Sequence, residues 1–324
     1  MKVGLIDVDK EHKKTDFPNL ALMKISAWHK SRGDTVEWYS PFFSGHLDKV
    51  YLSKVFSFTP DFEYYINADE IEKGGTGYAI EQVNGRETFI PEKHKNLPPE
   101  IEHIYPDYSL YGIQDTAIGF LSRGCPRGCD FCIVKDKEGL CATKVADLSE
   151  FWRGQKNIIL MDPNILACKD WPDLLQQLIN SKARVDFNQG LDIRMMTEKK
   201  AEMLAQIKIK NIHFAWDRIE DAEKIKPQFE IFRKHSKIRP KDLQVYVLVG
   251  DRKPRVLSAD LERIYWLREN GFAPYVMIFE KYKLQKGSDL LRLQRWVNNR
   301  IVFWKVKTFD EYTREHDKKK GDRK

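Results

Sequence analysis

The chain has 324 residues, of which 42% are hydrophobic and 32% are charged, and its formal net charge is +7. This length and composition predict one large domain or two of moderate size, each with its own core. No stretch approaches the roughly 20 apolar residues of a membrane span, and the first residues lack the long apolar run of a signal peptide. Five cysteines, three of them clustered, fit a reducing compartment. We therefore expect a cytoplasmic protein with no membrane association.

The positive charge is concentrated at the C-terminal end. From Lys281 onward the chain carries 14 Lys and Arg against 6 Asp and Glu, and it ends in the run from Lys318 to Lys324. Such a run is typical of a solvated tail, and we expect residues 313–324 to be disordered. Docking on nucleic acid through this basic end is the alternative.

The first 80 residues are predicted to form a small α/β domain. A strand is expected from Val3 to Val8, followed by a helix whose apolar residues recur at helical spacing from Leu20 to Trp28. Further strands are expected at 35–39 and 49–53. The strand–helix–strand order favours a small parallel sheet of Rossmann-like type.

Residues 81–115 are predicted to be a linker, because they contain several prolines and no sustained periodicity. Just before them, Gly74-Gly75-Thr76-Gly77 is interpreted as a turn leaving a strand. A phosphate cradle is the alternative interpretation of these glycines.

From residue 116 the pattern becomes a regular alternation of strands and helices, which predicts a parallel barrel, complete or partial, over 116–282. Residues 283–312 are expected to add a helical extension. The six expected strands are Ala117–Leu121, Ile158–Met161, Val185–Phe187, Ile212–Trp216, Leu243–Val249 and Ala273–Phe279. Helices are expected between them near Trp171–Ser181, Glu198–Ile207, Asp221–His235 and Ala259–Asn270.

Three cysteines stand directly after the first of these strands. Cys125, Cys129 and Cys132 have the spacing Cys-x3-Cys-x2-Cys, with Phe131 before the last. Three thiolates on one tight loop suit a cubane of four irons and four sulfides, and they leave one iron without a protein ligand. A zinc site that adds Cys141 as fourth ligand is the alternative. Otherwise Cys141 and Cys168 are expected to be buried, as spare cysteines usually are.

This cysteine run resembles the signature of radical S-adenosylmethionine (SAM) enzymes, and the six-unit pattern resembles their partial (β/α)6 barrel of TIM type. The resemblance implies a [4Fe-4S] cluster whose open iron binds SAM, reductive cleavage of SAM to a 5′-deoxyadenosyl radical, and hydrogen abstraction from a substrate. It also implies an external one-electron reductant of the flavodoxin or ferredoxin type. The substrate is a small molecule, a peptide or a nucleoside.

The N-terminal domain resembles the cobalamin-binding-like domain of some radical SAM enzymes. It departs from the cobalamin motif Asp-x-His-x-x-Gly, because in Asp9-Lys10-Glu11-His12 the histidine stands one place too late and no glycine follows at the required offset. We therefore expect no cobalamin.

Polar residues after the second and third strands gain roles from the resemblance. Asp162 and Asn164 stand where the family contacts the SAM amino group, although the family's usual Gly-Gly-Glu is absent. Gln189, Asp192 and Arg194 follow the third strand. Arg194 can hold a carboxylate, and Asp192 can accept from ribose hydroxyls or orient Arg194. An N-cap at Asp162 and a surface salt bridge between Asp192 and Arg194 are the structural alternatives.

Three further residues complete the implied cofactor site. Asp217 follows the fourth strand and contacts SAM or substrate, or caps the next helix. Val249 ends the fifth strand beside the adenine, or belongs to the core. Phe131 stacks on the adenine and shields the cluster from water. The competing hypothesis is a non-catalytic binding protein stabilised by zinc or an iron–sulfur cluster, with nucleic acid as its partner through the basic end.

Overall fold

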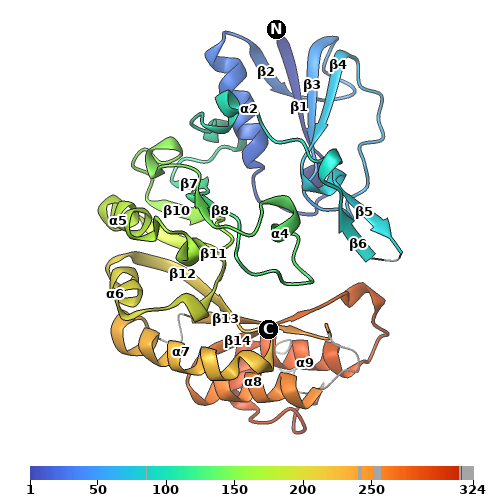
Figure 1. Ribbon diagram of the computed structural model, residues 1–324. Helices are drawn as coiled ribbons and strands as arrows, with labels where there is room; N and C mark the ends of the chain where they lie inside the picture. Colours follow the sequence, from blue (N-terminus) through green and yellow to red (C-terminus); the bar gives the residue numbers. More distant parts are fainter. Residues whose placement is uncertain (85, 240–242, 252–256, 314, 316–324) are drawn as a thin grey trace, which may run out of the picture.

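A computed structural model describes residues 1–84, 86–239, 243–251, 257–313 and 315 (Figure 1). It has a mixed α/β architecture built on two parallel sheets, one of four strands and one of six. Within the described residues, no helix is long and apolar enough to cross a membrane. The predicted disorder of the basic tail falls mainly on residues 316–324, which lie outside the described residues.

The four-stranded sheet is formed by the N-terminal region and has the strand order β2-β1-β3-β4, with all neighbours parallel. The three strands expected from sequence are confirmed. The bounds of its elements are β1 Lys2–Asp7, α1 Val8–Glu11, α2 Leu20–Ser31, β2 Thr35–Trp38, β3 Leu47–Ser53 and β4 Ala68–Gly74. Strand β4 was not expected, because its charged, largely exposed sequence suits the edge of a sheet and contains no apolar run.

Asn19 fixes helix α2 against the sheet. Its side-chain oxygen accepts from the backbone N–H of Leu22 at 3.2 Å, which caps the helix, and its amide donates to the Ser53 hydroxyl at 2.8 Å. The end of β3 and the start of α2 are therefore held together by one side chain.

The expected turn after β4 is present. Gly75 has φ of +98°, and a Cβ atom there would lie 2.3 Å from the carbonyl oxygen of Lys54. Only glycine fits so close to the segment that follows β3.

Residues 81–115, which the sequence predicts to be a linker, contain regular secondary structure. They include most of an antiparallel hairpin and several short helical turns. The elements from residue 76 to residue 111 are η1 Thr76–Tyr78, β5 Ile80–Val83, β6 Arg86–Phe89, η2 Pro91–Lys93, α3 Pro99–Glu102 and η3 Tyr108–Tyr111. Asp107 ties the region to α2, because its carboxylate accepts from Ser26 and Lys30, each at 2.6 Å.

The six-stranded sheet confirms the six strands expected after residue 116. Its order is β14-β13-β12-β11-β10-β7, so the strands lie side by side in chain order, and all pairs are parallel. The strands are β7 Thr116–Gly119, β10 Asn157–Leu160, β11 Arg184–Leu191, β12 Lys208–Ala215, β13 Leu243–Val249 and β14 Ala273–Ile278. The helices between them are α5 Trp171–Ser181, α6 Glu198–Gln206, α7 Ala222–Ser236 and α8 Leu257–Glu269.

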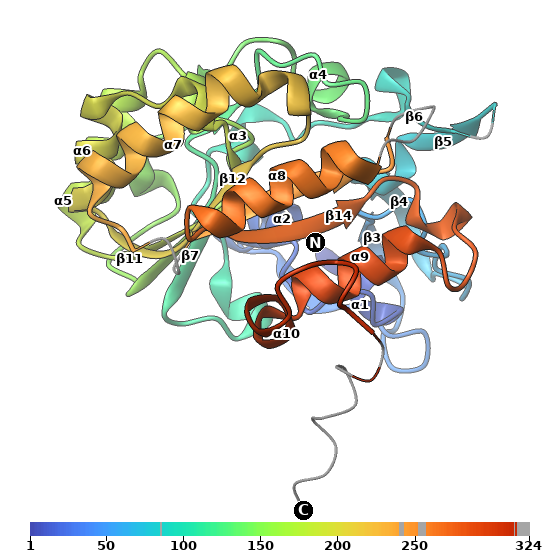
Figure 2. The same ribbon diagram turned by 90° about the horizontal axis from the view of Figure 1, so that it is seen from below.

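The two faces of this sheet differ. One face packs its aliphatic and aromatic side chains against the helices, as Val185, Phe187, Ile212 and Phe214 show by their complete or near-complete burial in the main core. Figure 2 shows α6, α7 and α8 along that side. On the other face of β14, Tyr275 and Met277 are 37% and 47% exposed. This second face is therefore partly open to solvent.

The expected C-terminal helical extension is also present, as α9 (Asp289–Asn298) and α10 (Arg300–Lys305). Helix α9 lies along the edge of β14, where the Asn298 side chain accepts from the backbone N–H of Val276 at 2.8 Å and donates to its carbonyl at 3.1 Å. These bonds satisfy backbone groups that a free edge would expose.

Candidate metal centre

The three clustered cysteines lie on a loop that opens and closes with a short antiparallel pair, β8 (Ser122–Arg123) and β9 (Thr143–Lys144). The loop follows the carboxyl end of β7, the edge strand of the six-stranded sheet. Helix α4 (Val134–Lys137) begins two residues after the third cysteine. In parallel α/β folds, ligands bind at this end of the strands.

Backbone contacts fix the shape of the loop. Gly124 has φ of +85°, and a Cβ atom there would lie 2.1 Å from the carbonyl oxygen of Cys141. The N–H of Cys125 donates to Gly139 at 3.2 Å, and that of Cys132 donates to Cys129 at 3.1 Å. The loop therefore returns upon itself, with glycine required at its start.

The three thiols are free, partly exposed and electrostatically coupled. Burial raises the pKa of Cys129 and of Cys132 above the ordinary thiol value, and neighbouring cysteines of the trio raise each further. Losing these protons therefore requires a compensating positive charge, which a metal supplies. Among the described residues, no three His, Cys, Asp or Glu side chains converge as a ready metal-ligand set.

Asn164 is the strongest sign that the site takes a ligand. It is 1% exposed and its side-chain amide donates to the Cys125 sulfur at 3.4 Å, but its Oδ1 atom is buried with no hydrogen-bond partner. A buried acceptor without a donor costs free energy. A ligand with a hydrogen-bond donor beside Cys125 would satisfy this oxygen atom.

Asp162 lies at the entry to the cysteine loop and is hydrogen-bonded there. Its carboxylate accepts from the backbone N–H groups of Leu121 and Ser122 at 3.1 and 2.5 Å, and from the Ser122 hydroxyl at 2.7 Å. Burial raises the pKa of this carboxyl to about 6, although the three donors oppose the change. Asp162 is thus a positioning residue that fixes the entry to the cysteine loop.

Asp192 and Arg194 are brought together with the cysteine loop. The Asp192 carboxylate accepts from Arg127 of the loop at 2.5 Å and from the Arg194 guanidinium at 2.7 Å, and Arg194 also donates to Asp221 at 2.7 Å. The contact between Asp192 and Arg194 is an ion pair, as the structural alternative also predicts. The positive charge of Arg194 lowers the pKa of Cys129 and so partly opposes the increase that burial causes.

The remaining predicted residues lie around the same strand ends. The negative charge of Asp217 raises the pKa of Cys129 and of Cys132, and its carboxylate accepts from the backbone N–H of Leu248 at 3.2 Å. Val249 is fully buried in the core. Phe131 is half-buried and Gln189 is exposed.

Two loop residues were not identified from the sequence as site residues. Glu138 accepts from the Gly124 N–H at 3.1 Å and from Arg123 at 3.2 Å, and Arg127 binds Asp192. Their partners are 14 to 65 positions away, so the only sequence signal was charge beside the cysteines. The expectation for Cys141 is wrong, because its side chain is exposed, whereas Cys168 is buried as expected.

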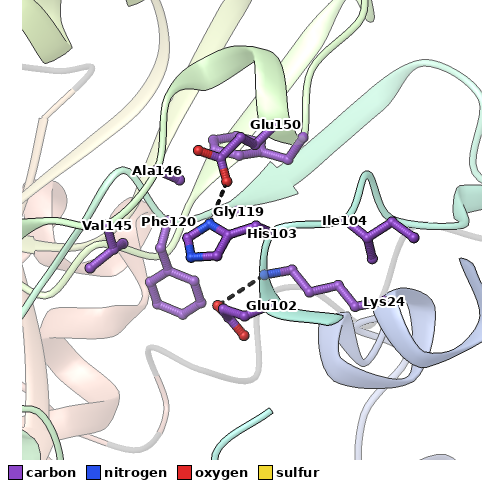
Figure 3. A pocket seen from close by; sticks show the side chains of 10 residues that line it. Lys24, Glu102, His103, Ile104, Gly119, Phe120, Val145, Ala146 and Glu150 are labelled. Carbon is purple, nitrogen blue, oxygen red and sulfur yellow. Dashed lines mark hydrogen bonds and ion pairs between the residues drawn. The ribbon is translucent and has the colours of Figure 1, made fainter. Parts of the chain in front are cut away.

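A small pocket lies beside the end of β7, and its lining does not include the three clustered cysteines (Figure 3). Lys24 of α2 pairs with Glu102 at 2.9 Å, and His103 pairs with Glu150 at 2.8 Å. Glu102 also approaches Arg123 at 3.6 Å. Glu102 therefore links Lys24 of the N-terminal region to Arg123, which precedes the cysteine loop.

Comparison with known proteins gives no assignment: no protein-family model matches the chain, and no curated protein matches it.

Proposed function

We propose that the chain is a radical SAM enzyme that holds a [4Fe-4S] cluster through Cys125, Cys129 and Cys132 and binds SAM at the carboxyl ends of the six-stranded sheet. In this proposal the sheet with its helices is a partial barrel over 116–282, and residues 1–80 form a Rossmann-like domain. The observation that carries it is the unpaired Oδ1 atom of Asn164, a residue of the segment that follows β10, whose amide donates to the first cysteine.

A bound cluster of this kind supplies one low-potential electron, which in the resembled family cleaves SAM to methionine and a 5′-deoxyadenosyl radical. The residues of this chain bind and orient the reactants. Asn164 accepts from the SAM ammonium, and Arg194, held by Asp192 and Asp221, presents guanidinium N–H groups to the SAM carboxylate. Phe131, on the cysteine loop, borders the adenine and excludes water from the site, whereas Val249 belongs to the core beneath it.

The partners follow from this chemistry. A flavodoxin- or ferredoxin-type protein in the cytoplasm delivers the electron, and the substrate contributes the hydrogen atom that is abstracted.

The experiment is anaerobic reconstitution with iron and sulfide, followed by SAM and dithionite. We expect a brown protein that forms methionine and 5′-deoxyadenosine. Cys129→Ser should lose both cluster and cleavage, whereas Cys141→Ser should keep both. Stoichiometric zinc and no SAM cleavage in the wild-type protein would instead support the non-catalytic binding protein.

A further inference from the structure

A second group of polar side chains lies on the face of the six-stranded sheet that the helices leave uncovered. Asp186 of β11, Asn211 and His213 of β12, Tyr246 of β13 and Tyr275 of β14 share this face, and we call them the Asp186 cluster. Asp186 pairs in register with Asn211, and Tyr246 with Tyr275. The rings of His213 and Tyr246 are stacked, with centroids 4.9 Å apart and planes 9° apart.

Asp186 is buried without a balancing charge. It is 8% exposed, and its Oδ2 atom accepts from the Asn211 amide at 2.6 Å, but its Oδ1 atom is buried with no partner. Within the described part of the chain, no Lys, Arg or His forms an ion pair with it. Buried carboxylates are normally paired with a cation.

His213 does not supply the missing charge. Burial lowers its pKa below the ordinary histidine value, against the opposing influence of Asp186, so the ring is neutral near pH 7. Its Nδ1 atom is also buried and unpaired. Two unsatisfied polar atoms on adjacent strands thus lie among aromatic rings.

We propose that the Asp186 cluster binds a planar cation of guanidinium type on the substrate, with its charge neutralised by Asp186. A guanidinium offers several N–H donors in one plane, which suits acceptors on two neighbouring strands, and it stacks on aromatic faces. The rings of Tyr246 and Tyr275 pack edge to face, with centroids 5.9 Å apart, and the Tyr275 ring is 37% exposed, so it offers an aromatic surface beside Asp186. The assignment of this cation to the substrate rests on the proposed function, in which the reactants bind at the carboxyl ends of these strands.

The test uses the reconstituted full-length protein and two probes of equal shape, n-butylguanidinium and neutral n-butylurea. The affinity for each probe is measured by saturation-transfer NMR titration. We expect wild type to bind butylguanidinium at least tenfold more tightly than butylurea. Asp186→Asn should weaken butylguanidinium binding at least tenfold. Asp115→Asn, which removes an equal charge at an exposed site paired with Lys156, should leave it unchanged.

Tyr275→Leu gives an independent check, because this ring is 37% exposed and its loss leaves the core intact. It should weaken butylguanidinium binding about two- to tenfold. Equal binding of the two probes by wild type, no binding of butylguanidinium, or wild-type affinity in both Asp186→Asn and Tyr275→Leu would each overturn the inference. SAM cleavage is measured separately on wild type, and its absence would overturn the proposed function without touching the cation site.

Discussion

At the scale of single residues, Asp162 shows how a buried carboxylate can hold the start of a loop. Three donors from Leu121 and Ser122 surround it, and it is 3% exposed. Removing the carboxylate would leave at least one buried N–H group without an acceptor, which typically costs about 1–3 kcal/mol. The start of the cysteine loop is thus held from the neighbouring strand.

The raised pKa of Asp162 predicts a pH dependence of stability. Its folded-state pKa of about 6 lies above the ordinary value of 3.8, so its contribution to stability is present at low pH and is lost as the pH rises through 6. Asp162→Asn does not titrate. In urea unfolding, the stability of wild type relative to this variant should be greater at pH 5 than at pH 7.5, by about 1 kcal/mol. The account would be contradicted if the stability of wild type relative to Asp162→Asn were the same at both pH values or lower at pH 5.

Glu138 should govern how firmly the loop retains iron. Glu138→Ala removes both the ion pair with Arg123 and the acceptor for the Gly124 N–H, whereas Glu138→Gln removes only the ion pair. After reconstitution and a timed chelator challenge, we expect the Ala variant to retain less than half of the wild-type iron, and the Gln variant an intermediate amount. Asp130→Asn is the matched control, since this loop carboxylate is 87% exposed. If Glu138→Ala retained as much iron as wild type, the contacts of Glu138 with Arg123 and Gly124 would have no such role.

The candidate site was only partly predictable at this scale. The cysteines, Asn164 and the Asp192–Arg194 pair were found because each follows a predicted strand end. The contacts of Glu138 and Arg127 were not, because they join residues that only the folded chain brings together. The exposure of Cys141 was also missed, since residue type alone gives only an average burial.

At the scale of elements, the sequence predicted strands well where they are buried and poorly where they are exposed. The six strands after residue 116 carry apolar residues that pack under helices, and their pattern is local. Strand β4 and the β5–β6 hairpin expose most of their residues. Their stability depends on backbone pairing with neighbours, which leaves little hydrophobic signal.

The β8–β9 pair provides a test at the element scale. Gly124→Ala forces a positive φ on alanine and places its Cβ atom 2.1 Å from the Cys141 carbonyl oxygen. Gly33→Ala also has a positive φ, of +82°, but meets no atom within 4 Å. We expect the Gly33 variant to lose about 1 kcal/mol of unfolding free energy and the Gly124 variant clearly more, measured by urea unfolding. Equal losses would mean that the close approach at Gly124 is unimportant.

At the scale of the whole molecule, the two sheets share packing and polar contacts. Met23 of α2 belongs to the core of the six-stranded sheet. Tyr111 donates to Asp7 of β1 at 2.5 Å, and Asp107 binds Ser26 and Lys30. These contacts couple the N-terminal sheet to the region that leads into β7.

This coupling predicts a single unfolding transition for the wild-type protein, followed by tryptophan fluorescence and by far-UV circular dichroism. Asp107→Ala removes the bonds to α2 and should lower the unfolding midpoint or separate the two signals. Two resolved transitions in wild type would contradict the coupling of the sheets.

The central claim is that the three-cysteine loop leaves one iron of a cluster open to SAM. The most direct measurement is the electron paramagnetic resonance spectrum of the reduced, reconstituted protein with and without SAM. We predict a cluster signal that changes shape when SAM is added and that is absent in Cys129→Ser. A signal unaffected by saturating SAM, or a protein that takes up no cluster at all, would contradict the account.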